Sequence, residues 1–382
     1  MKKEQFLYEK IYSDIKNRIH TGELKEGTCL PQIGELAADF GVSTITVTNA
    51  LNALRDEGYL NRIKGKGSFV QLPEESFRDS RDLERLPLRD GEAASVKPGE
   101  TGGERMLGLV LEHISSCFGL DMMYAADELA AKAGYKLCVR FSYGIREKET
   151  EEIEFLKNLG VCGIIVMPCH GLYYNTEILK LVIEGFPMVL IDKNMEGIPV
   201  PSVRTDNHLA MTELVDYLVG KGKRKIGFIT FSENGTSSIK DRKKGFRDAV
   251  KRAGAQRMAE CCLEGAEKIN IYSEDFNEDH RDMIETYLRD NRELEAVICA
   301  EYGIARCLGK QKEQEDREKI TVCCIDEDYL SPGGPHFTHI KQNEKKIAFE
   351  AIRILLKQVE KDDPGYEQMD CLVPGIFREV EN

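Results

Sequence analysis

The sequence predicts an α/β protein in which a small α+β head precedes a large body built on parallel sheets. In residues 106–380, continuous apolar runs alternate with amphipathic helical patterns, as in parallel sheets that are covered on both faces. Residues 1–72 instead show three short helical patterns followed by a β-hairpin pattern. Residues 73–105 are rich in charge, Pro and Gly, which is typical of a flexible linker between two domains.

The composition indicates a globular protein with an acidic body. The chain carries 53 Lys and Arg against 66 Asp and Glu, for a net charge of −13. Residues 1–72 are close to neutral, so the negative charge lies in the remainder of the chain. An acidic surface discourages general binding to nucleic acid, so any DNA contact is expected in the head. Because the chain shows neither a membrane span nor a signal-peptide pattern, we expect a cytoplasmic protein.

The twelve cysteines predict neither a disulfide framework nor a metal site. They are scattered, and no C-x-x-C pair or Cys/His cluster has the spacing of zinc ligands. Most lie in apolar contexts such as ITVCCID, residues 320–326, where a thiol behaves as a small hydrophobic group. We therefore expect reduced, buried cysteines and no metal or cofactor; a redox role for some of the thiols is the alternative.

The head has the order helix, helix, helix, hairpin. The first pattern repeats an apolar residue every fourth position through residues 7–19. The second ends at Gly41, and the third begins at Ser43, which can cap it. Two short strands, residues 59–63 and 68–72, then flank a Lys-Gly-Lys-Gly turn. Two short helices joined by a tight glycine turn form the helix-turn-helix pattern.

The third helix and the hairpin carry residue types that contact DNA. Amide and hydroxyl side chains can bond to base edges, and lysines can hold the phosphate backbone. Glycines in the turn allow positive φ and a close approach to a phosphate. The predicted DNA-contacting residues are Pro31, Ser43, Thr44, Thr46, Thr48, Asn49, Asn52, Lys64, Gly65, Lys66 and Gly67. The alternative is a solvated helix face beside an ordinary hairpin turn.

Seven apolar runs in the body are predicted strands. They are residues 106–113, 136–142, 162–168, 187–192, 225–231, 295–300 and 320–326. In parallel sheets, ligands bind beyond the carboxyl ends of the strands. The residues directly after each run are therefore the candidates for a binding site.

The segment from Leu30 to Val70 resembles the winged helix-turn-helix of GntR-type bacterial transcription regulators. Residue types match at Leu30-Pro31, Leu36-Ala37, Val42-Ser43, Thr46-Val47, Ala50-Leu51, Glu57-Gly58 and from Gly65 to Val70. The resemblance implies operator DNA as a partner and a homodimer that reads a palindrome. The family pattern has arginines where this chain has Thr44 and Thr48. Two lost cations weaken phosphate binding, so we expect Lys64 and Lys66 to carry more of it.

The body resembles the effector domain of LacI-type repressors, which has the periplasmic-binding-protein fold. The similarity rests on runs such as GVCGIIVMP and VCCIDED and covers most of residues 106–380. It implies one lobe of about 106–206 and 338–355 and another of about 207–337 and 356–380. It also implies a small-molecule effector of the sugar class between the lobes. A GntR-type head on such a body resembles the subgroup typified by the bacterial arabinose-operon repressor.

Carried over position by position, the resemblance marks candidate effector contacts. They are His113, Ser115, Cys117, Phe118, Asp192, Arg242, Tyr272, Glu301, Tyr302 and Asp326. Sugars need paired hydrogen bonds to planar Asp, Asn and Arg groups and an aromatic ring against the apolar sugar face. Each residue has a structural alternative: the two aspartates can cap turns, the arginine can belong to a basic surface run, and the histidine can be an ordinary structural residue.

No catalytic motif accompanies these residues. The chain lacks a P-loop, a G-x-S-x-G elbow and an H-E-x-x-H pair, so we expect no enzymatic activity. The sequence therefore predicts a transcription repressor whose operator affinity is controlled by a small molecule, most simply a sugar. Two alternatives remain: a solute-binding module without a DNA role leaves the head unexplained, and a sugar-handling enzyme needs acid–base pairs in its cleft.

Overall fold

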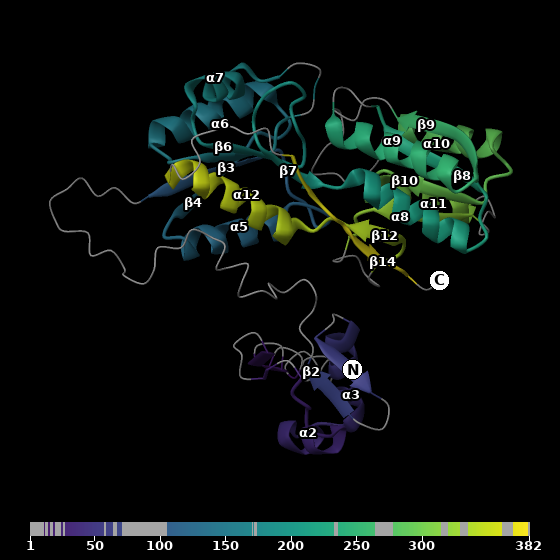
Figure 1. Ribbon diagram of the computed structural model, residues 1–382. Helices are drawn as coiled ribbons and strands as arrows, with labels where there is room; N and C mark the ends of the chain where they lie inside the picture. Colours follow the sequence, from purple (N-terminus) through teal and green to yellow (C-terminus); the bar gives the residue numbers. More distant parts are fainter. Residues whose placement is uncertain are drawn as a thin grey trace. The chain divides into compact units, whose positions relative to one another are not determined.

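The computed structural model of the 382-residue chain divides into two compact units, residues 1–85 and 86–382 (Figure 1). The structure describes residues 11, 14–15, 18–19, 24–25, 27–56, 59–63, 67–70, 105–169, 171, 174–232, 236–263, 278–314, 320–328, 335–360 and 370–380. The predicted linker, residues 73–105, lies outside this set except for its last residue. None of the helices in these ranges is long and apolar enough to cross a membrane.

The head is a winged helix-turn-helix fold around one apolar core. Helices α2 (Ile33–Phe40) and α3 (Thr44–Asp56) meet at Gly41, whose left-handed φ of 62° ends α2. Strand β1 (Leu60–Ile63) pairs antiparallel with β2 (Gly67–Val70). The buried core residues are Ile11, Ile15, Ile19, Leu30, Leu36, Ala37, Val47, Ala50, Leu51, Leu54, Leu60 and Val70. The predicted second helix, third helix and hairpin are thereby confirmed.

Local hydrogen bonds fix where the head helices begin. Glu35 accepts the backbone N–H of the α2 N-cap at 2.9 Å and closes a capping box. Ser43 Oγ accepts the N–H of Thr46 at 3.2 Å, so the predicted cap of α3 is confirmed. One pairing was not predicted: Cys29 forms an antiparallel bridge with Phe69 and so extends the wing beyond its two strands.

The first lobe of the body is a six-stranded, fully parallel sheet with strand order β13-β7-β6-β5-β3-β4. Its strands are β3 (Met106–Leu111), β4 (Lys136–Phe141), β5 (Ile164–Val166), β6 (Met188–Ile191), β7 (Ser202–Thr205) and β13 (Asp370–Val373). Helices α5 (Leu120–Lys132) and α12 (Glu344–Glu360) lie on one face, and α6 (Arg146–Leu159) and α7 (Thr176–Glu184) lie on the other (Figure 1). Strands β5 and β6 are buried along their whole length, as two covered faces require.

The second lobe repeats this arrangement, with strand order β14-β12-β11-β10-β8-β9. Its strands are β8 (Lys225–Phe231), β9 (Gln256–Leu263), β10 (Ala296–Cys299), β11 (Thr321–Ile325), β12 (Thr338–Lys341) and β14 (Ile376–Arg378). Only β14 runs antiparallel to its neighbour. Its helices are α8 (Asn207–Gly220), α9 (Ser237–Arg252), α10 (Glu278–Asp290) and α11 (Tyr302–Gln314). The β3–β7 and β8–β12 series therefore hold equivalent places in the two sheets.

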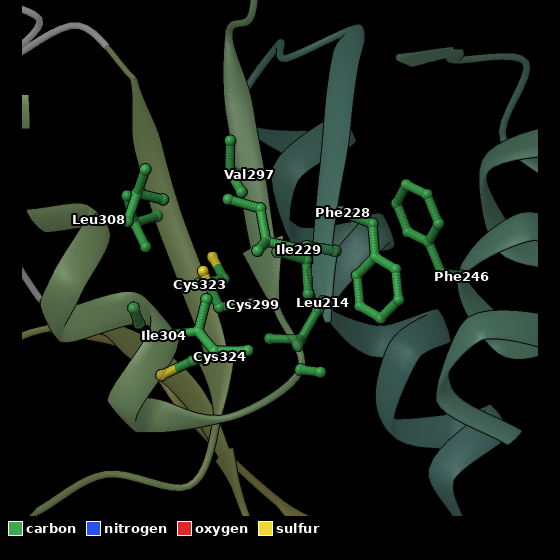
Figure 2. Packing of buried hydrophobic residues seen from close by; sticks show 14 of the residues in the cluster. Leu214, Phe228, Ile229, Phe246, Val297, Cys299, Ile304, Leu308, Cys323 and Cys324 are labelled. Atoms are coloured by element: carbon green, nitrogen blue, oxygen red, sulfur yellow. The ribbon is translucent and has the colours of Figure 1, made fainter. Parts of the chain in front are cut away.

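The core of the second lobe combines aromatic rings with thiols (Figure 2). Phe228 of β8 stacks on Phe246 of α9 with ring centroids 4.9 Å apart. Cys299, Cys323 and Cys324 are fully buried, and burial raises the pKa of the Cys323 thiol to about 12. All twelve cysteines are free thiols, but only five are buried, six are half-buried and Cys29 is exposed, so the prediction of burial holds for part of the set. Those in this core act as small hydrophobic groups.

The chain crosses between the two lobes three times. The crossings lie between β7 and α8, between β12 and α12, and between β13 and β14. The predicted lobe ranges were wrong in the C-terminal part, because β12 joins the second sheet whereas all of α12 and β13 belong with the first. Apolar periodicity identifies a strand or helix, but long-range pairing decides which sheet it joins.

Candidate functional site

The exposed part of α3 is the candidate DNA surface of the head. Thr44 is exposed and Thr48 is half-buried, and the Thr48 hydroxyl donates to the Thr44 carbonyl at 2.7 Å. Thr48 therefore keeps a methyl group and acceptor lone pairs for another partner. Thr46 is only 8% exposed, and its hydroxyl bonds to Ser43 at 2.8 Å. This pair stabilises the start of the helix.

The other DNA candidates are only partly described. Pro31 is exposed directly before the α2 N-cap. Gly67 begins β2 with a φ of 119°, a conformation that favours glycine. The side chains of Asn49 and Asn52, and all of Lys64, Gly65 and Lys66, lie outside the described residues.

Candidate effector residues lie where the parallel strands of the two lobes end. Asp192 follows β6 and Asp326 follows β11, the equivalent strands of the two sheets. Both residues have a positive φ, 65° and 62°, which is strained for a side chain other than glycine and recurs at functional sites. Their N–H groups bond to the next strand in each lobe, to Val203 at 3.0 Å and to Ile340 at 2.9 Å. One carboxylate thus stands at the end of each sheet in matched geometry.

Arg242 and Asp326 form the polar centre on the side of the second lobe. Arg242 is 4% exposed and donates from Nε to Asn207 Oδ1 and from Nη1 to the Ala300 carbonyl, both at 2.8 Å. Burial raises the pKa of Asp326 to about 6, although the Arg242 charge acts in the opposite direction. The alternative that Arg242 belongs to a basic surface run is therefore wrong. The charges of Arg242 and of the half-buried Glu301 both act on Asp326.

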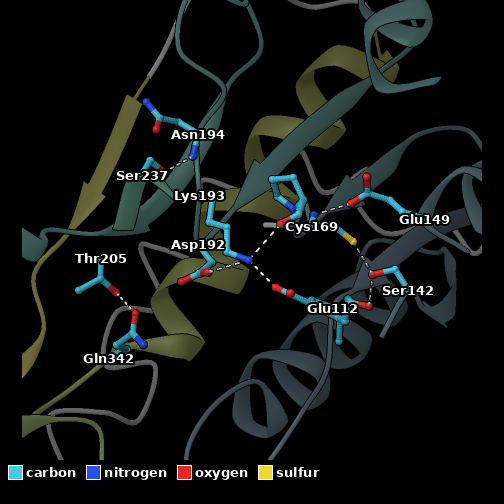
Figure 3. Close-up of polar contacts among 12 residues, drawn as sticks. Glu112, Ser142, Glu149, Cys169, Asp192, Lys193, Asn194, Thr205, Ser237 and Gln342 are labelled. Atoms are coloured by element: carbon cyan, nitrogen blue, oxygen red, sulfur yellow. Dashed lines mark hydrogen bonds and ion pairs between the residues drawn. The ribbon is translucent and has the colours of Figure 1, made fainter. Parts of the chain in front are cut away.

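A buried ion pair that was not predicted lies on the side of the first lobe (Figure 3). Lys193 is 4% exposed, pairs with Glu112 and donates to the Pro168 carbonyl at 3.0 Å. Burial alone would lower the pKa of Lys193, but the carboxylates of Glu112 and Asp192 outweigh it and raise the pKa. Glu112 directly follows β3, and Lys193 directly follows Asp192. Lys193 directly follows the predicted strand 187–192, so inspection of that position would have identified it, whereas Glu112 lies inside the predicted strand 106–113.

A second buried network fixes the neighbouring loops of this lobe. Glu149 is 1% exposed and accepts the N–H of Cys169 at 2.7 Å and Nδ2 of Asn175 at 2.8 Å. The Cys169 thiol donates to Ser142 Oγ at 3.2 Å (Figure 3). These bonds hold the ends of β4 and β5 beside the Lys193 pair.

The loop after β3 belongs to the first lobe and contacts the second lobe. His113 and Phe118 are half-buried, and the exposed Ser115 accepts the N–H groups of Cys117 and Phe118 with its hydroxyl, each at 3.2 Å. Cys117 packs against the core of the second lobe, and burial raises its pKa to about 12. Ser115 therefore shapes this loop, while Cys117 forms the contact with the second lobe.

The candidate effector contacts also include two tyrosines, Tyr302 and Tyr272. Tyr302 is 4% exposed and belongs to the core of the second lobe, with its ring centroid 6.3 Å from that of Phe337. Tyr272 lies outside the described residues. In the described part of the chain, no group of three or more His, Cys, Asp or Glu is arranged to hold a metal ion.

Contacts with the first turns of α9 also join the lobes. They are Asn194 to Ser237 (3.0 Å, Figure 3), Glu196 to Lys240 (2.5 Å) and Arg204 to Asp241. Asn194 lies two residues after Asp192, and Asp241 directly precedes Arg242. The candidate effector residues of the two lobes are therefore neighbours of the contacts between them.

Comparison with protein families accounts for both parts of the chain. Residues 7–70 match the family described as bacterial regulatory proteins, gntR family. Residues 104–321, more than half of the chain, match the family described as periplasmic binding proteins and sugar binding domain of LacI family. The chain belongs to this LacI-type family. Its head is a GntR-type winged helix-turn-helix.

Relatives of this LacI-type chain include named transcription regulators. The arabinose metabolism transcriptional repressor of Geobacillus stearothermophilus is 26% identical over 243 residues, which are 63% of this chain and 60% of that protein. The HTH-type transcriptional regulator RegA of Clostridium saccharobutylicum is 25% identical over 344 residues, 87% of this chain and 95% of that protein. The crystal structure of the transcription regulator CcpA of Lactococcus lactis shares the fold, with a TM-score of 0.61 and 22% identity over 72% of this chain and 98% of that one.

The LacI-type body contains one more buried acid beside the site. Glu344 at the start of α12 is 5% exposed and accepts the N–H groups of Gly119 at 2.8 Å and Met122 at 3.0 Å with the same oxygen. It thereby caps the N-terminus of α5. Burial, together with the charges of Asp326 and Asp121, raises its pKa to about 7.

We expect Glu344 and Asp326 to reduce the stability of the LacI-type body as pH rises from about 5 to about 7, while His339, whose pKa burial lowers to about 4, acts in the opposite direction. The folded pKa values of Glu344 and Asp326, about 7 and about 6, exceed their ordinary values of 4.5 and 3.8. The folded state therefore binds more protons in this window, and the free energy of unfolding falls as these protons are lost. Glu344→Gln keeps one oxygen for both N–H groups and should stabilise the body by about 2–4 kcal/mol at pH 7.5.

Differential scanning calorimetry from pH 5 to pH 8 measures this effect. Glu128→Gln, which removes an exposed carboxylate from α5, is the control and should leave the pH profile unchanged. If Glu344→Gln and the unsubstituted chain show equally steep profiles, Glu344 does not titrate in this window.

Proposed function

We propose that this chain is a DNA-binding transcription repressor whose affinity for operator DNA is lowered by a neutral sugar bound at the boundary of its two lobes. The observation that carries the proposal is the presence in one chain of a GntR-type head and a LacI-type sugar-binding body. A solute-binding module needs no helix-turn-helix, and a sugar-handling enzyme needs no head. Regulation of DNA binding by a small molecule uses both parts.

The proposed DNA contacts come from α3 and from the wing. Thr44 and Thr48 lie on α3 with their side chains at least partly exposed. Hydroxyl and methyl groups at these positions suit phosphate oxygens and thymine methyl groups. Asn49, Asn52, Lys64 and Lys66 complete the proposed contacts on sequence grounds.

We expect Thr44→Glu to weaken operator binding by about tenfold or more, because a carboxylate on this face repels phosphate. The measurement is fluorescence anisotropy with the full-length chain and a duplex from upstream of its own coding sequence. Thr286→Glu makes the same change at an exposed position on α10 and is the matched control. Equal affinity of the unsubstituted chain for this duplex and for unrelated DNA would contradict a regulatory role.

Charge at the lobe boundary favours a neutral effector. Lys193 is engaged by Glu112 and the Pro168 carbonyl, and Arg242 is engaged by Asn207 and the Ala300 carbonyl. An anionic sugar phosphate would have to compete with these partners and lie near additional carboxylates, which costs electrostatic free energy. Sugar hydroxyls can instead donate to Asp192 and Asp326. The name of the Geobacillus relative makes arabinose the first sugar to examine.

We expect a neutral monosaccharide, and no sugar phosphate, to raise the melting temperature of the full-length chain. A thermal-shift panel of L-arabinose, D-xylose, D-ribose, D-galactose, D-ribose 5-phosphate and D-fructose 1-phosphate measures this. Arg242→Lys removes the paired guanidinium contacts and should abolish the rise. Stabilisation by the phosphates alone would contradict a neutral effector, and NMR detection of sugar turnover would favour the enzyme alternative.

We also propose that the chain is a homodimer, since two heads are needed to read a palindromic operator. A surface of the first lobe supports this. Among the described residues, strand β4 is the terminal strand at one edge of its sheet, and helices α5 and α6 contact it. These helices expose Tyr124 (64%), Phe155 (45%) and Leu159 (42%). Large exposed apolar side chains beside the terminal strand of a sheet are typical of an interface between subunits.

We expect Tyr124→Asp/Leu159→Asp to convert the dimer to a monomer and to weaken operator binding, because charges introduced into the interface must be desolvated. Sedimentation velocity measures the mass in solution. Ile183→Asp, at an 86% exposed position on α7, introduces the same kind of charge away from the β4 edge and is the control. If the double variant keeps the mass of the unsubstituted chain, this surface is not the interface.

A further inference from the structure

Three residues form a directed chain of hydrogen bonds across the boundary of the lobes. The Thr205 hydroxyl donates to Gln342 Oε1 at 2.6 Å (Figure 3). Gln342 then donates from Nε2 to Asp326 Oδ2 at 2.8 Å, and its backbone N–H lies 3.3 Å from Asp326 Oδ1. All three residues are at least nine-tenths buried, so water does not replace these bonds easily.

This chain of bonds lies at the crossings between the lobes. Thr205 ends β7, directly before the first crossing, and Gln342 lies in the second crossing between β12 and α12. The N–H of Asp206 bonds to the carbonyl of Val373 at 2.8 Å and so joins the first crossing to the third. A shift between the lobes therefore must change the geometry at Thr205 and Gln342.

The chemistry of the groups gives the chain a direction. An ionised carboxylate only accepts hydrogen bonds, so the NH2 group of Gln342 must face Asp326 and its oxygen must face Thr205. Rotation of the amide would bring two acceptors together at Asp326. A change in the position of the Asp326 carboxylate consequently alters the bond between Gln342 and β7.

The same crossing also reaches the candidate loop of the first lobe. The N–H of Glu344 bonds to the Gln342 carbonyl at 2.9 Å, and Glu344 caps α5 through Gly119 and Met122. The loop that precedes α5 carries Ser115 and Cys117. Gln342 is therefore hydrogen-bonded to residues that lie on both sides of the candidate effector site.

We propose that Gln342 is a positioning residue for the effector response: it holds Asp326 in place and transmits the engagement of Asp326 by effector to β7 of the first lobe. The inference rests on the proposed function, because it assigns a route by which sugar binding changes the arrangement of the lobes. Such coupling requires that the effector bind one of two arrangements of the lobes more tightly than the other. In this proposal, the bonds from Gln342 to Thr205 and Asp326 differ between these two arrangements.

Three substitutions separate this role from simple packing. Thr205→Val is nearly isosteric and removes the donor to Gln342 while leaving the bonds to Asp326. Gln342→Leu removes both side-chain bonds. Ser202→Ala is the matched control, because Ser202 is a buried hydroxyl on the same strand that bonds to Asp370 at 2.6 Å and not to the crossing.

Operator affinity is measured with and without L-arabinose for each full-length variant. Thr205→Val should reduce the ratio of operator affinity without sugar to operator affinity with sugar by about threefold to tenfold, because one hydrogen bond is lost. The Kd for the sugar should stay within about twofold of the unsubstituted chain. Gln342→Leu should weaken both sugar binding and the response, and Ser202→Ala should change neither. A normal response in Thr205→Val and Gln342→Leu would overturn the proposal.

A second readout does not depend on any sugar. Gln342→Leu removes a donor that favours the ionised form of Asp326, so the pH region in which deprotonation of Asp326 lowers the stability of the body should move upward. Thr205→Val and Ser202→Ala should leave it in place. Five titratable groups interact electrostatically with Asp326, and all three variants keep them. They are Arg242, Glu301, Glu344, Cys117 and Cys324.

The two readouts separate the possible failures. If L-arabinose and the other panel sugars neither bind nor change operator affinity, the proposed function fails, while the pH profile of Gln342→Leu still tests whether Gln342 positions Asp326. If the sugars act normally on the unsubstituted chain and the pH profile of Gln342→Leu is unchanged, the positioning role fails and the proposed function stands.

Discussion

The three crossings of the backbone between two parallel sheets are the constraint on which the body depends. They bring the ends of β7, β12 and β13 together, and hydrogen bonds join the lobes at this point. Because parallel strands all end at one edge of a sheet, this connection also brings the candidate binding groups of the lobes near one another. Fold and site thus follow from one topological arrangement.

Buried charge at this boundary is balanced by specific partners. An isolated buried ion is very costly, and Lys193 with Glu112 and Arg242 with its two acceptors reduce that cost. Asp326 and Glu344 are compensated less completely, and their raised pKa values result from burial. The boundary therefore holds two buried carboxyl groups whose pKa values lie well above their ordinary values.

Much of the fold could be predicted from local sequence patterns. The seven apolar runs became β3, β4, β5, β6, β8, β10 and β11, because continuous hydrophobicity reports a strand that is covered on both faces. The remaining strands of the body were missed. β7 includes Arg204 and β9 includes charged residues, so neither reads as an apolar run. Their place in a sheet depends on partners far away in sequence.

The sequence by itself determined the helix-turn-helix, the alternation of strands and helices, and the concentration of negative charge outside the head, since these depend on neighbouring residues and on composition. Family resemblance also marked Asp192, Arg242 and Asp326 as candidate effector contacts, and these stay predictions. Only the tertiary structure decided that Arg242 is buried, that Lys193 pairs with Glu112, and that Gln342 joins Asp326 to β7. These contacts link residues that are 16 to 137 positions apart in the sequence, and no local pattern encodes such pairings.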